Sequence, residues 1–145
     1  MRLTLHTDYA LRLLMHLALA PDRLVTISEV ADAYAISRNH LVKVAHELGR
    51  EGFVETLRGR GGGLRLARPP EDISIGHVVR VMEEDFRIVE CFDRNTNTCC
   101  IAPACRLKHL LREAMDAWVA VLDGATLADL IARPAPLRRL LALVG

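Results

Sequence analysis

The stretch that decides the fold runs from Ile27 to Ala67 and reads ISEVADAYAISRNHLVKVAHELGREGFVETLRGRGGGLRLA. Its first half contains two short segments with apolar residues at positions 27, 30, 31 and 34, and again at 41, 44, 45 and 48. This spacing places the apolar residues of each segment on one face of a helix. Ala35 and Ile36 separate the segments, and Ser37 is a suitable N-cap for the second one. The pattern predicts a helix-turn-helix.

The second half of this stretch predicts a β-hairpin. Phe53 to Leu57 is rich in strand-forming residues, residues 58–63 form a glycine-rich turn, and residues 64–67 alternate between apolar and polar. Strand, turn and strand in this order are typical of a hairpin. Because Arg58 and Arg60 flank the glycines, we interpret the hairpin as the wing of a winged helix-turn-helix.

Outward from this stretch, the chain divides into four parts. We expect a winged helix-turn-helix head over residues 1–70, a helix and a cysteine-containing loop over 71–102, a long helix over 103–124, and a short helix and tail over 125–145. Pro103 suits the first turn of the long helix, and Pro134 and Pro136 are expected to break the tail. The predicted fold class is mainly α with a small β wing.

The long helix carries an apolar stripe over about five turns. The stripe consists of Leu107, Leu110, Leu111, Ala114, Trp118, Val121 and Leu122. A small head does not need so long a stripe for its own core, so we expect the helix to form the interface of a homodimer. The alternative is that the stripe packs within its own chain.

The distribution of charge favours a DNA-binding head. The formal net charge of the whole chain is only +1, whereas residues 36–68 hold seven Lys or Arg and three Glu, a local net charge of +4. Arginine and lysine can donate to guanine, and asparagine can pair with adenine. The residues expected to contact DNA are Ser37, Arg38, Asn39, His40, Lys43, Arg58, Arg60, Gly61 and Gly62. The alternative for these residues is an ordinary solvated charged face.

The N-terminal segment resembles a signal peptide only superficially. A leucine-rich run follows Arg2, but Asp8, Arg12 and His16 interrupt it and lie opposite the apolar stripe of an amphipathic helix. No segment is long and apolar enough to cross a membrane. We therefore expect a cytoplasmic protein, in which clustered cysteines favour a metal or a reactive thiol over structural disulfides.

All four cysteines lie between residues 91 and 105, at Cys91, Cys99, Cys100 and Cys105. The spacing is unlike the paired C-x2-C of most structural zinc sites, and adjacent cysteines rarely bind the same ion. An iron–sulfur cluster tolerates wider spacing in a loop. An iron–sulfur cluster, a zinc ion, a thiol switch and inert thiols all remain open from the residues alone.

The sequence does not predict an enzyme. The six histidines are scattered and form no pattern of nucleophile and base with a cysteine, and the glycines at 59 and 61–63 lack the Gly-Lys-Ser/Thr ending of a phosphate loop. An iron–sulfur redox protein is the remote alternative, although it would not need the basic residues of the predicted recognition helix and wing.

Four segments of the chain together resemble the winged-helix iron–sulfur transcriptional regulators. These segments are LTLHTDYALR at 3–12, ISRNHLVK at 36–43, RGRGGGLRLA at 58–67 and CCIAPACRLK at 99–108. The resemblance extends over essentially the whole chain. It implies a dimer that binds an inverted-repeat operator in double-stranded DNA and holds an iron–sulfur cluster, most often [4Fe–4S], with [2Fe–2S] as the alternative.

The resemblance also implies a set of cluster ligands. Three cysteines hold the cluster in this family and five residues separate the last two, which selects Cys99 and Cys105, with Cys91 as the first ligand. The seven residues between Cys91 and Cys99 exceed the five of several members, and Cys100 is the fallback ligand.

The fourth ligand distinguishes branches of this family. One branch has a histidine three residues after the last cysteine, where this chain has Lys108. In the branch of nitric-oxide-sensing repressors the fourth ligand resembles an aspartate from the partner subunit, at the position of Asp8, which on residues alone is an ordinary first-turn acid. The resemblance thus implies a repressor that loses DNA affinity when nitric oxide reacts with its cluster. The alternatives are regulators that sense cluster or iron status, or thiol oxidation.

Overall fold

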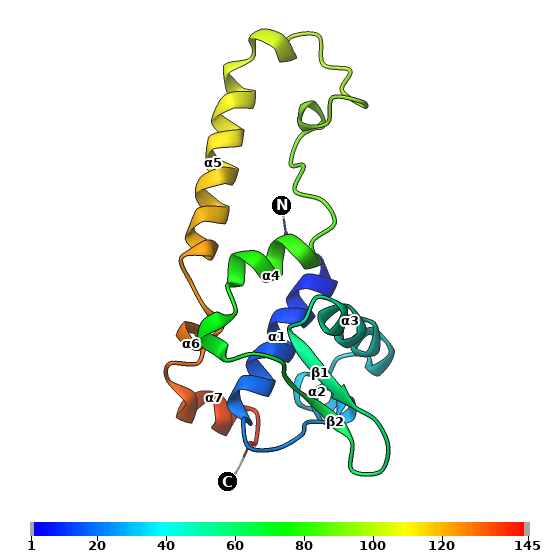
Figure 1. The fold of residues 1–145 in the computed structure, drawn as a ribbon. Coiled ribbons are helices and arrows are strands. Elements are labelled where there is room, and N and C mark those ends of the chain that lie inside the picture. The colour runs from blue at the N-terminus through cyan, green and yellow to red at the C-terminus, as the bar shows by residue number, and fades with distance from the viewer. Residues whose placement is uncertain (1, 144–145) are drawn as a thin grey trace.

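The computed structural model describes residues 2–143. It contains a head and an arm (Figure 1). We define the arm as the loop of residues 83–105 together with the long helix α5, Arg106–Asp123. The head contains the wing strands β1, Val54–Leu57, and β2, Gly63–Leu66, together with the remaining helices. These helices are α1, Leu5–Leu19; α2, Ile27–Tyr34; α3, Arg38–Arg50; α4, Ile75–Met82; α6, Leu127–Leu130; and α7, Pro134–Leu140.

Helix α1 runs through the centre of the head. Leu13 and Leu14 of α1 are fully buried, as are Leu41 of α3, Phe53 before the wing and Val78 of α4. Full burial of a leucine or phenylalanine side chain contributes about 1.5–3 kcal/mol relative to exposure. The recognition helix α3 and the start of the arm after α4 are therefore both anchored on the same helix.

The helix-turn-helix and the wing form as the sequence predicts. Ala35, in the turn between α2 and α3, has a left-handed backbone with φ of 53°, and its N–H donates to the carbonyl of Ala31. Strands β1 and β2 pair antiparallel, with Val54 opposite Leu66. The prediction of a mainly helical fold with a two-stranded wing is confirmed.

Two predictions about prolines were wrong. Pro103 does not begin the long helix but lies in a separate 3-10 turn, Ala102–Ala104, and α5 begins at Arg106. Pro134 and Pro136 do not break the tail, because they lie in the first turn of α7. The N–H groups of a first turn have no partner within the helix, so proline is tolerated there.

Helix α5 buries only part of its apolar surface against its own chain. Met115 is buried, and Trp118 and Leu122 pack against the core of the head. The adjoining side of the same helix is exposed, with Leu107 at 60%, Leu110 at 61% and Val121 at 73%. The head therefore covers only part of the predicted stripe. Among the described residues, no helix is long and apolar enough to span a membrane.

The crossing of α4 and α5 generates a prediction about two glycines. A Cβ added at Gly76 of α4 would lie 2.8 Å from the backbone nitrogen of Asp123, whereas one added at Gly49 of α3 would have no atom within 3.8 Å. Gly76→Ala should lower the free energy of unfolding by about 1–3 kcal/mol, since the backbone must shift. Gly49→Ala, the matched control, should raise it by about 0.5–1 kcal/mol. Urea unfolding of both variants measures this, and equal effects would contradict the close approach of α4 to α5.

Candidate DNA interface and metal centre

The first turns of α3 present the side chains that we expect to read DNA. Ser37 caps the helix, and its Oγ accepts a hydrogen bond from the backbone N–H of His40 at 3.4 Å. Arg38, Asn39 and Lys43 are exposed, while the opposite face of α3 packs into the core. Because Ser37 uses an oxygen lone pair for the cap, its hydroxyl hydrogen stays available for a phosphate.

His40 differs from its exposed neighbours. Its ring lies edge-on to the ring of Tyr9, with 4.8 Å between centroids, and is stacked on the ring of His6 at 5.7 Å. Both of these partners belong to α1. His40 is half-buried by these contacts, which sequence reasoning did not anticipate because residues 6, 9 and 40 are distant along the chain.

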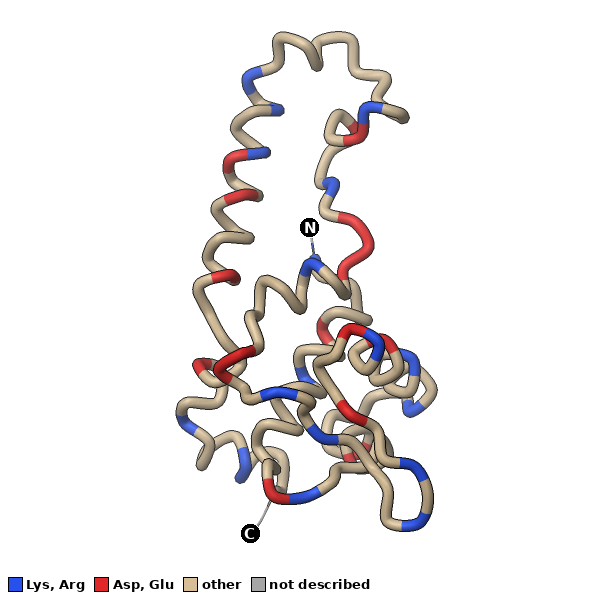
Figure 2. Tube along the Cα trace, viewed as in Figure 1, with Lys and Arg blue, Asp and Glu red and all other residues tan. Residues whose placement is uncertain are grey.

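The wing presents a basic and very tight turn. Arg58 and Arg60 are exposed at the turn. In Figure 2 the loop of the wing contains segments in the blue of Lys and Arg. Gly61 has φ of 75°, a conformation that favours glycine. A Cβ on Gly62 would lie 2.9 Å from the carbonyl oxygen of Gly59, so the turn excludes a side chain there. The glycines are therefore required by the turn itself, independently of any contact with DNA.

Two of the cations in this region are used within the head. Arg65 pairs with Glu55 across the wing strands at 2.8 Å. Arg68 donates from Nε to the carbonyl of Gly52 at 3.1 Å, and its guanidinium lies 5.2 Å from the centroid of the Phe53 ring. These two arginines raise the local net charge, and the contacts that they make lie within the wing and its start.

The four cysteines all lie on the arm. Cys91, Cys99 and Cys105 are half-buried, whereas Cys100 is exposed, and all four are free thiols. Within the part of the chain that the structure describes, no three Cys, His, Asp or Glu side chains are gathered closely enough to hold a metal ion. Three half-buried thiols are nevertheless the donor type that iron–sulfur clusters use, so the chemistry of this set fits such a cluster.

Polar contacts order the loop on both sides of Cys91. Arg87 pairs with Asp85 at 2.8 Å and also with Asp93. The hydrogen bond from Arg87 lowers the pKa of Asp85, and the hydrogen bond from the backbone of Asn95 lowers the pKa of Asp93. The lowered pKa values reflect hydrogen bonds to the charged form of each carboxylate, and both carboxylates pair with Arg87.

Neighbours of Cys91 contact the segments that carry the other cysteines. The hydroxyl of Thr98, next to Cys99, donates to Glu90 at 3.3 Å. On the other side, the Arg112 guanidinium of α5 lies 4.0 Å from the centroid of the Phe92 ring. These contacts link Cys91 to Cys99 and to the helix that begins after Cys105. Sequence reasoning missed them because nothing in the spacing of these residues signals the pairings.

Cys105 is the N-cap of α5 and therefore precedes the helix, whereas the expected helix over residues 103–124 would include it in the first turn. Its Sγ accepts a hydrogen bond from the backbone N–H of Lys108 at 3.4 Å. A helix N-terminus carries a partial positive charge, which favours a negatively charged group at this position. The cap thus fixes the sulfur at the junction between the loop and α5.

Asp8 lies apart from the cysteines in the same chain. It is in the first turn of α1, inside the head, while the cysteines occupy the far part of the arm (Figure 1). The Asp8 carboxylate accepts two hydrogen bonds from Arg12, at 2.6 and 3.1 Å. The helix N-cap is Thr4, so Asp8 is not itself the capping residue.

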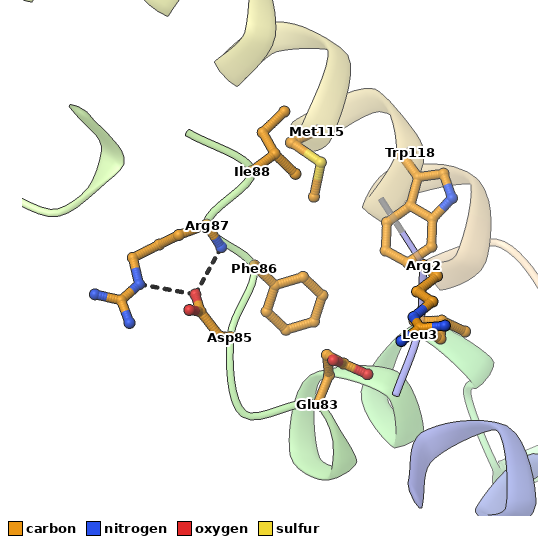
Figure 3. A pocket seen from close by; sticks show the side chains of 9 residues that line it. All are labelled: Arg2, Leu3, Glu83, Asp85, Phe86, Arg87, Ile88, Met115 and Trp118. Carbon is orange, nitrogen blue, oxygen red and sulfur yellow. Dashed lines mark hydrogen bonds and ion pairs between the residues drawn. The ribbon is translucent and has the colours of Figure 1, made fainter. Parts of the chain in front are cut away.

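A hollow of about 440 Å³ lies where the arm meets the head (Figure 3). The rings of Phe86 and Trp118 border it, with 6.4 Å between their centroids. Glu83 at its edge is buried and accepts hydrogen bonds from the hydroxyls of Thr4 and Thr7, the latter at 2.6 Å. Glu83 therefore ties the start of the arm to the first turn of α1.

Comparisons with known proteins point to one family. The model of the Rrf2 family, described as an iron-dependent transcriptional regulator, matches residues 3–133. The HTH-type transcriptional regulator NsrR of Bacillus subtilis (strain 168) is 54% identical over 144 residues, covering 99% of this chain and 99% of that protein. NsrR of Shouchella clausii (strain KSM-K16) is 54% identical over 142 residues, covering 97% of this chain and 95% of that protein.

Solved structures show the same fold. The global cysteine regulator CymR of B. subtilis superposes with a TM-score of 0.74 at 26% identity, covering 91% of this chain and 97% of that one. IscR of T. potens gives a TM-score of 0.73 at 26% identity, covering 91% and 87%. These similarities confirm the fold class expected from the sequence.

The difference in exposure among the thiols generates a prediction. In metal-free protein kept reduced, limiting iodoacetamide should alkylate Cys100 several-fold faster than the other three cysteines, because only Cys100 is exposed. Peptide mass spectrometry at low extents of reaction measures the order. Cys100→Ser should remove the fast phase and leave the slow one, and initial labelling at Cys91 or Cys99 would contradict the arrangement of the loop.

Proposed function

Because this chain belongs to the Rrf2 family of iron-dependent transcriptional regulators, we propose that it is a dimeric repressor that senses nitric oxide through an iron–sulfur cluster. The family is one of DNA-binding regulators, so the expectation of a regulator and not an enzyme is confirmed. The observation that carries the proposal is the set of three half-buried thiols on the arm, in a chain 54% identical to NsrR over nearly its full length. As a regulator of transcription, it would act in the cytoplasm.

Cys91, Cys99 and Cys105 are the proposed cysteine ligands. Their partial burial and the cap at Cys105 support this choice over Cys100, whose exposed side chain makes it the fallback. The loop would have to close around the cluster, since its thiols are not gathered in the described residues. We propose a [4Fe–4S] cluster, with [2Fe–2S] as the alternative. Iron analysis distinguishes them, because the first contains four irons per chain and the second contains two.

Asp8 of the partner subunit is the proposed fourth ligand. The separation of Asp8 from the cysteines of its own chain supports a ligand that comes from a second copy. Lys108 occupies the position at which other members have a histidine, and a protonated lysine has no lone pair to offer a metal. The carboxylate is a harder ligand for iron than a thiolate, so this position would be the more labile one.

The exposed stripe of α5 supports the dimer. Leu107, Leu110 and Val121 lie on one side of an 18-residue helix and are all more than half exposed. A second copy of the same helix would bury them in an isologous interface. Such a dimer presents two α3 helices to an inverted-repeat operator, whose half-sites lie about one helical turn apart.

The signal is proposed to act by releasing Asp8. A bound cluster supplies iron that nitric oxide can attack. Asp8 would then separate from the arm of the other subunit, and that arm would no longer hold the α1 helix that carries Asp8. Because α1 is the central helix of the head, its movement would alter the spacing of the two α3 helices and weaken operator binding.

The exposed thiol of Cys100 beside Cys99 supports one second candidate, a regulator that responds to thiol oxidation.

The cofactor and the signal can be tested on one sample. Protein purified without oxygen should show broad visible absorption from thiolate-to-iron charge transfer, because thiolates would hold the iron. Iron and sulfide should be present in equal amounts with little zinc. Adding nitric oxide should bleach the absorption and weaken operator binding at least about fivefold, the smaller end of typical allosteric coupling.

Two variants provide the control for this experiment. Cys100→Ser should keep both the absorption and the response, whereas Cys105→Ala should lose them. A colourless protein that contains zinc, or that contains no metal after anaerobic reconstitution, would refute the cluster. In that case, a response to oxidants that disappears in Cys100→Ser would favour the thiol switch.

The proposed DNA contacts predict two different losses of affinity. Asn39→Ala should cost about 1–3 kcal/mol on the specific operator and little on unrelated DNA, because it removes a base contact. Arg60→Ala should weaken binding to both sequences and lower the slope of log K against log salt by about one, because it removes a phosphate contact. Titrations of both DNAs at several salt concentrations measure these effects, with Arg65→Ala as the control on a side chain that pairs within the wing. Equal losses for all three variants would contradict the assignment.

A further inference from the structure

We propose that the C-terminal helix α7 sets the position of the wing for DNA binding, and that Arg138 is the positioning residue through which it acts. The connection runs through residues 20–26, the connecting loop, which joins α1 to α2. One end of this loop meets α7 and the other end meets the wing. The inference rests on the proposed function, because it assumes that the wing contacts DNA.

Arg138 closes the C-terminal end of α1. The last carbonyls of a helix have no partner within the helix and carry a partial negative charge. Arg138 Nε donates a hydrogen bond to the carbonyl of Leu19, the last residue of α1, at 3.0 Å. Figure 1 shows α7 beside this end of α1. A guanidinium is favourable there through both its hydrogen bond and its charge, so α7 fixes the point at which the connecting loop begins.

The end of α7 is a defined turn that also reaches the connecting loop. The backbone N–H of Leu143 donates to the carbonyl of Arg138 at 2.8 Å, and that of Ala142 donates to the carbonyl of Arg139 at 3.2 Å. Ala142 has a left-handed backbone with φ of 53°. These features together form a Schellman turn. The turn brings Leu143 back beside the connecting loop, where it lines a hollow with Pro21.

The other end of the connecting loop carries the wing. The backbone N–H of Val25 donates to the carbonyl of Leu64 at 3.0 Å, and the N–H of Leu64 donates to the carbonyl of Val25 at 2.7 Å. A Cβ added at Gly63, the first residue of β2, would lie 2.8 Å from the carbonyl oxygen of Val25 and 3.1 Å from the Cβ of Leu24. Strand β2 therefore lies directly against the loop. A shift of the loop would displace this strand and the turn that holds Arg60.

The connecting loop is also held between its two ends. Arg23 Nη1 donates to Oε2 of Glu29 in α2 at 2.9 Å. The same carboxylate contacts the fully buried His16 of α1, with 3.2 Å between Oε1 and Nε2. A segment held in this way has few ways to absorb a displacement locally. Movement at Leu19 is therefore passed on to Val25.

Arg138 and its neighbour Arg139 separate position from charge. Both side chains are cationic and belong to the same helix, but Arg138 is half-buried and Arg139 is exposed. A loss of positive charge alone should weaken DNA binding similarly at either residue. Any additional loss at Arg138 reports the hydrogen bond to Leu19 and the position that it fixes.

The test compares Arg138→Met with Arg139→Met in the full-length protein purified without oxygen. Methionine keeps a long apolar stem and removes every donor, and both variants lose the same charge. Arg138→Met should weaken operator binding at least about twofold more than Arg139→Met, the smaller end of the coupling between residues linked by a backbone shift. Titration of the operator with each protein measures the difference.

A second pair of variants shows whether the effect passes through the wing. In protein that also carries Arg60→Ala, Arg138→Met and Arg139→Met should weaken operator binding equally, because the contact that Arg138 positions has already been removed. An Arg138 that bound phosphate itself would cost the same affinity whether or not Arg60 is present.

Hydrogen exchange locates the structural change without DNA. Arg138→Met should speed exchange of the amides of Val25 and Leu64, which donate the hydrogen bonds between the loop and the wing. Exchange in α3 should stay at the wild-type rate, and Arg139→Met should leave all of these rates unchanged. Faster exchange throughout the head would identify a general loss of stability and would overturn the positioning role.

The affinities separate the proposal from the function on which it rests. Wild-type affinity in the Arg60→Ala protein would refute the wing contact, and with it the role of Arg138 in DNA binding. If Arg60→Ala weakens binding while Arg138→Met and Arg139→Met bind equally well, the wing contact stands and the positioning role is wrong. An additional loss in Arg138→Met that persists in the Arg60→Ala protein would overturn the positioning role as well.

Discussion

The length and direction of α5 determine where the cysteine loop lies relative to the head and which apolar side chains stay exposed. Its 18 residues, at about 1.5 Å per residue, carry the end of the cysteine loop about 27 Å from the base of the arm. Asp8 lies in the head, so within a single chain the proposed oxygen ligand is far from the three proposed sulfur ligands on the arm. The same helix leaves Leu107, Leu110 and Val121 exposed. A single copy is thus incomplete in both its proposed metal site and its apolar packing, and one partner chain would complete both.

Within the head, one helix carries both the proposed oxygen ligand and contacts to α3, the helix that we propose reads DNA. Helix α1 contributes Asp8 at one end of its surface, buries Leu13 and Leu14 in the core, and contacts α3 through Tyr9. The buried Glu83 holds the start of the arm to the first turn of the same helix. An event at the proposed cluster therefore does not need a long path through the protein, because the helix that would sense it already touches the helix that would read DNA.

Local patterns predicted the elements well, and long-range contacts set the limits of that prediction. The apolar spacing from Ile27 to Leu48 placed α2 and α3 correctly, because a buried helical face repeats at a fixed period. Pro134 misled because proline ends a helix in its interior but not in its first turn. The family followed from the resemblance of four segments along the chain, and that resemblance implied the candidate ligands, with the five residues between Cys99 and Cys105 selecting these two. The contact of His40 with Tyr9, and that of Phe92 with Arg112, have no local signal, so only the structure locates them.

The proposed sharing of the metal site between subunits is tested most directly in dimers whose two subunits carry different substitutions. Asp8→Ala and Cys105→Ala subunits, bearing different affinity tags, are co-expressed, and the mixed dimer is isolated without oxygen for iron and sulfide analysis. If the ligands come from two chains, the cysteines of the Asp8→Ala subunit meet the intact Asp8 of the Cys105→Ala subunit, and the mixed dimer should hold one cluster, half the wild-type content. If each chain supplies all of its own ligands, both sites in the mixed dimer are damaged. A mixed dimer with no more iron than the two parent homodimers would contradict the central claim that the site is shared between subunits.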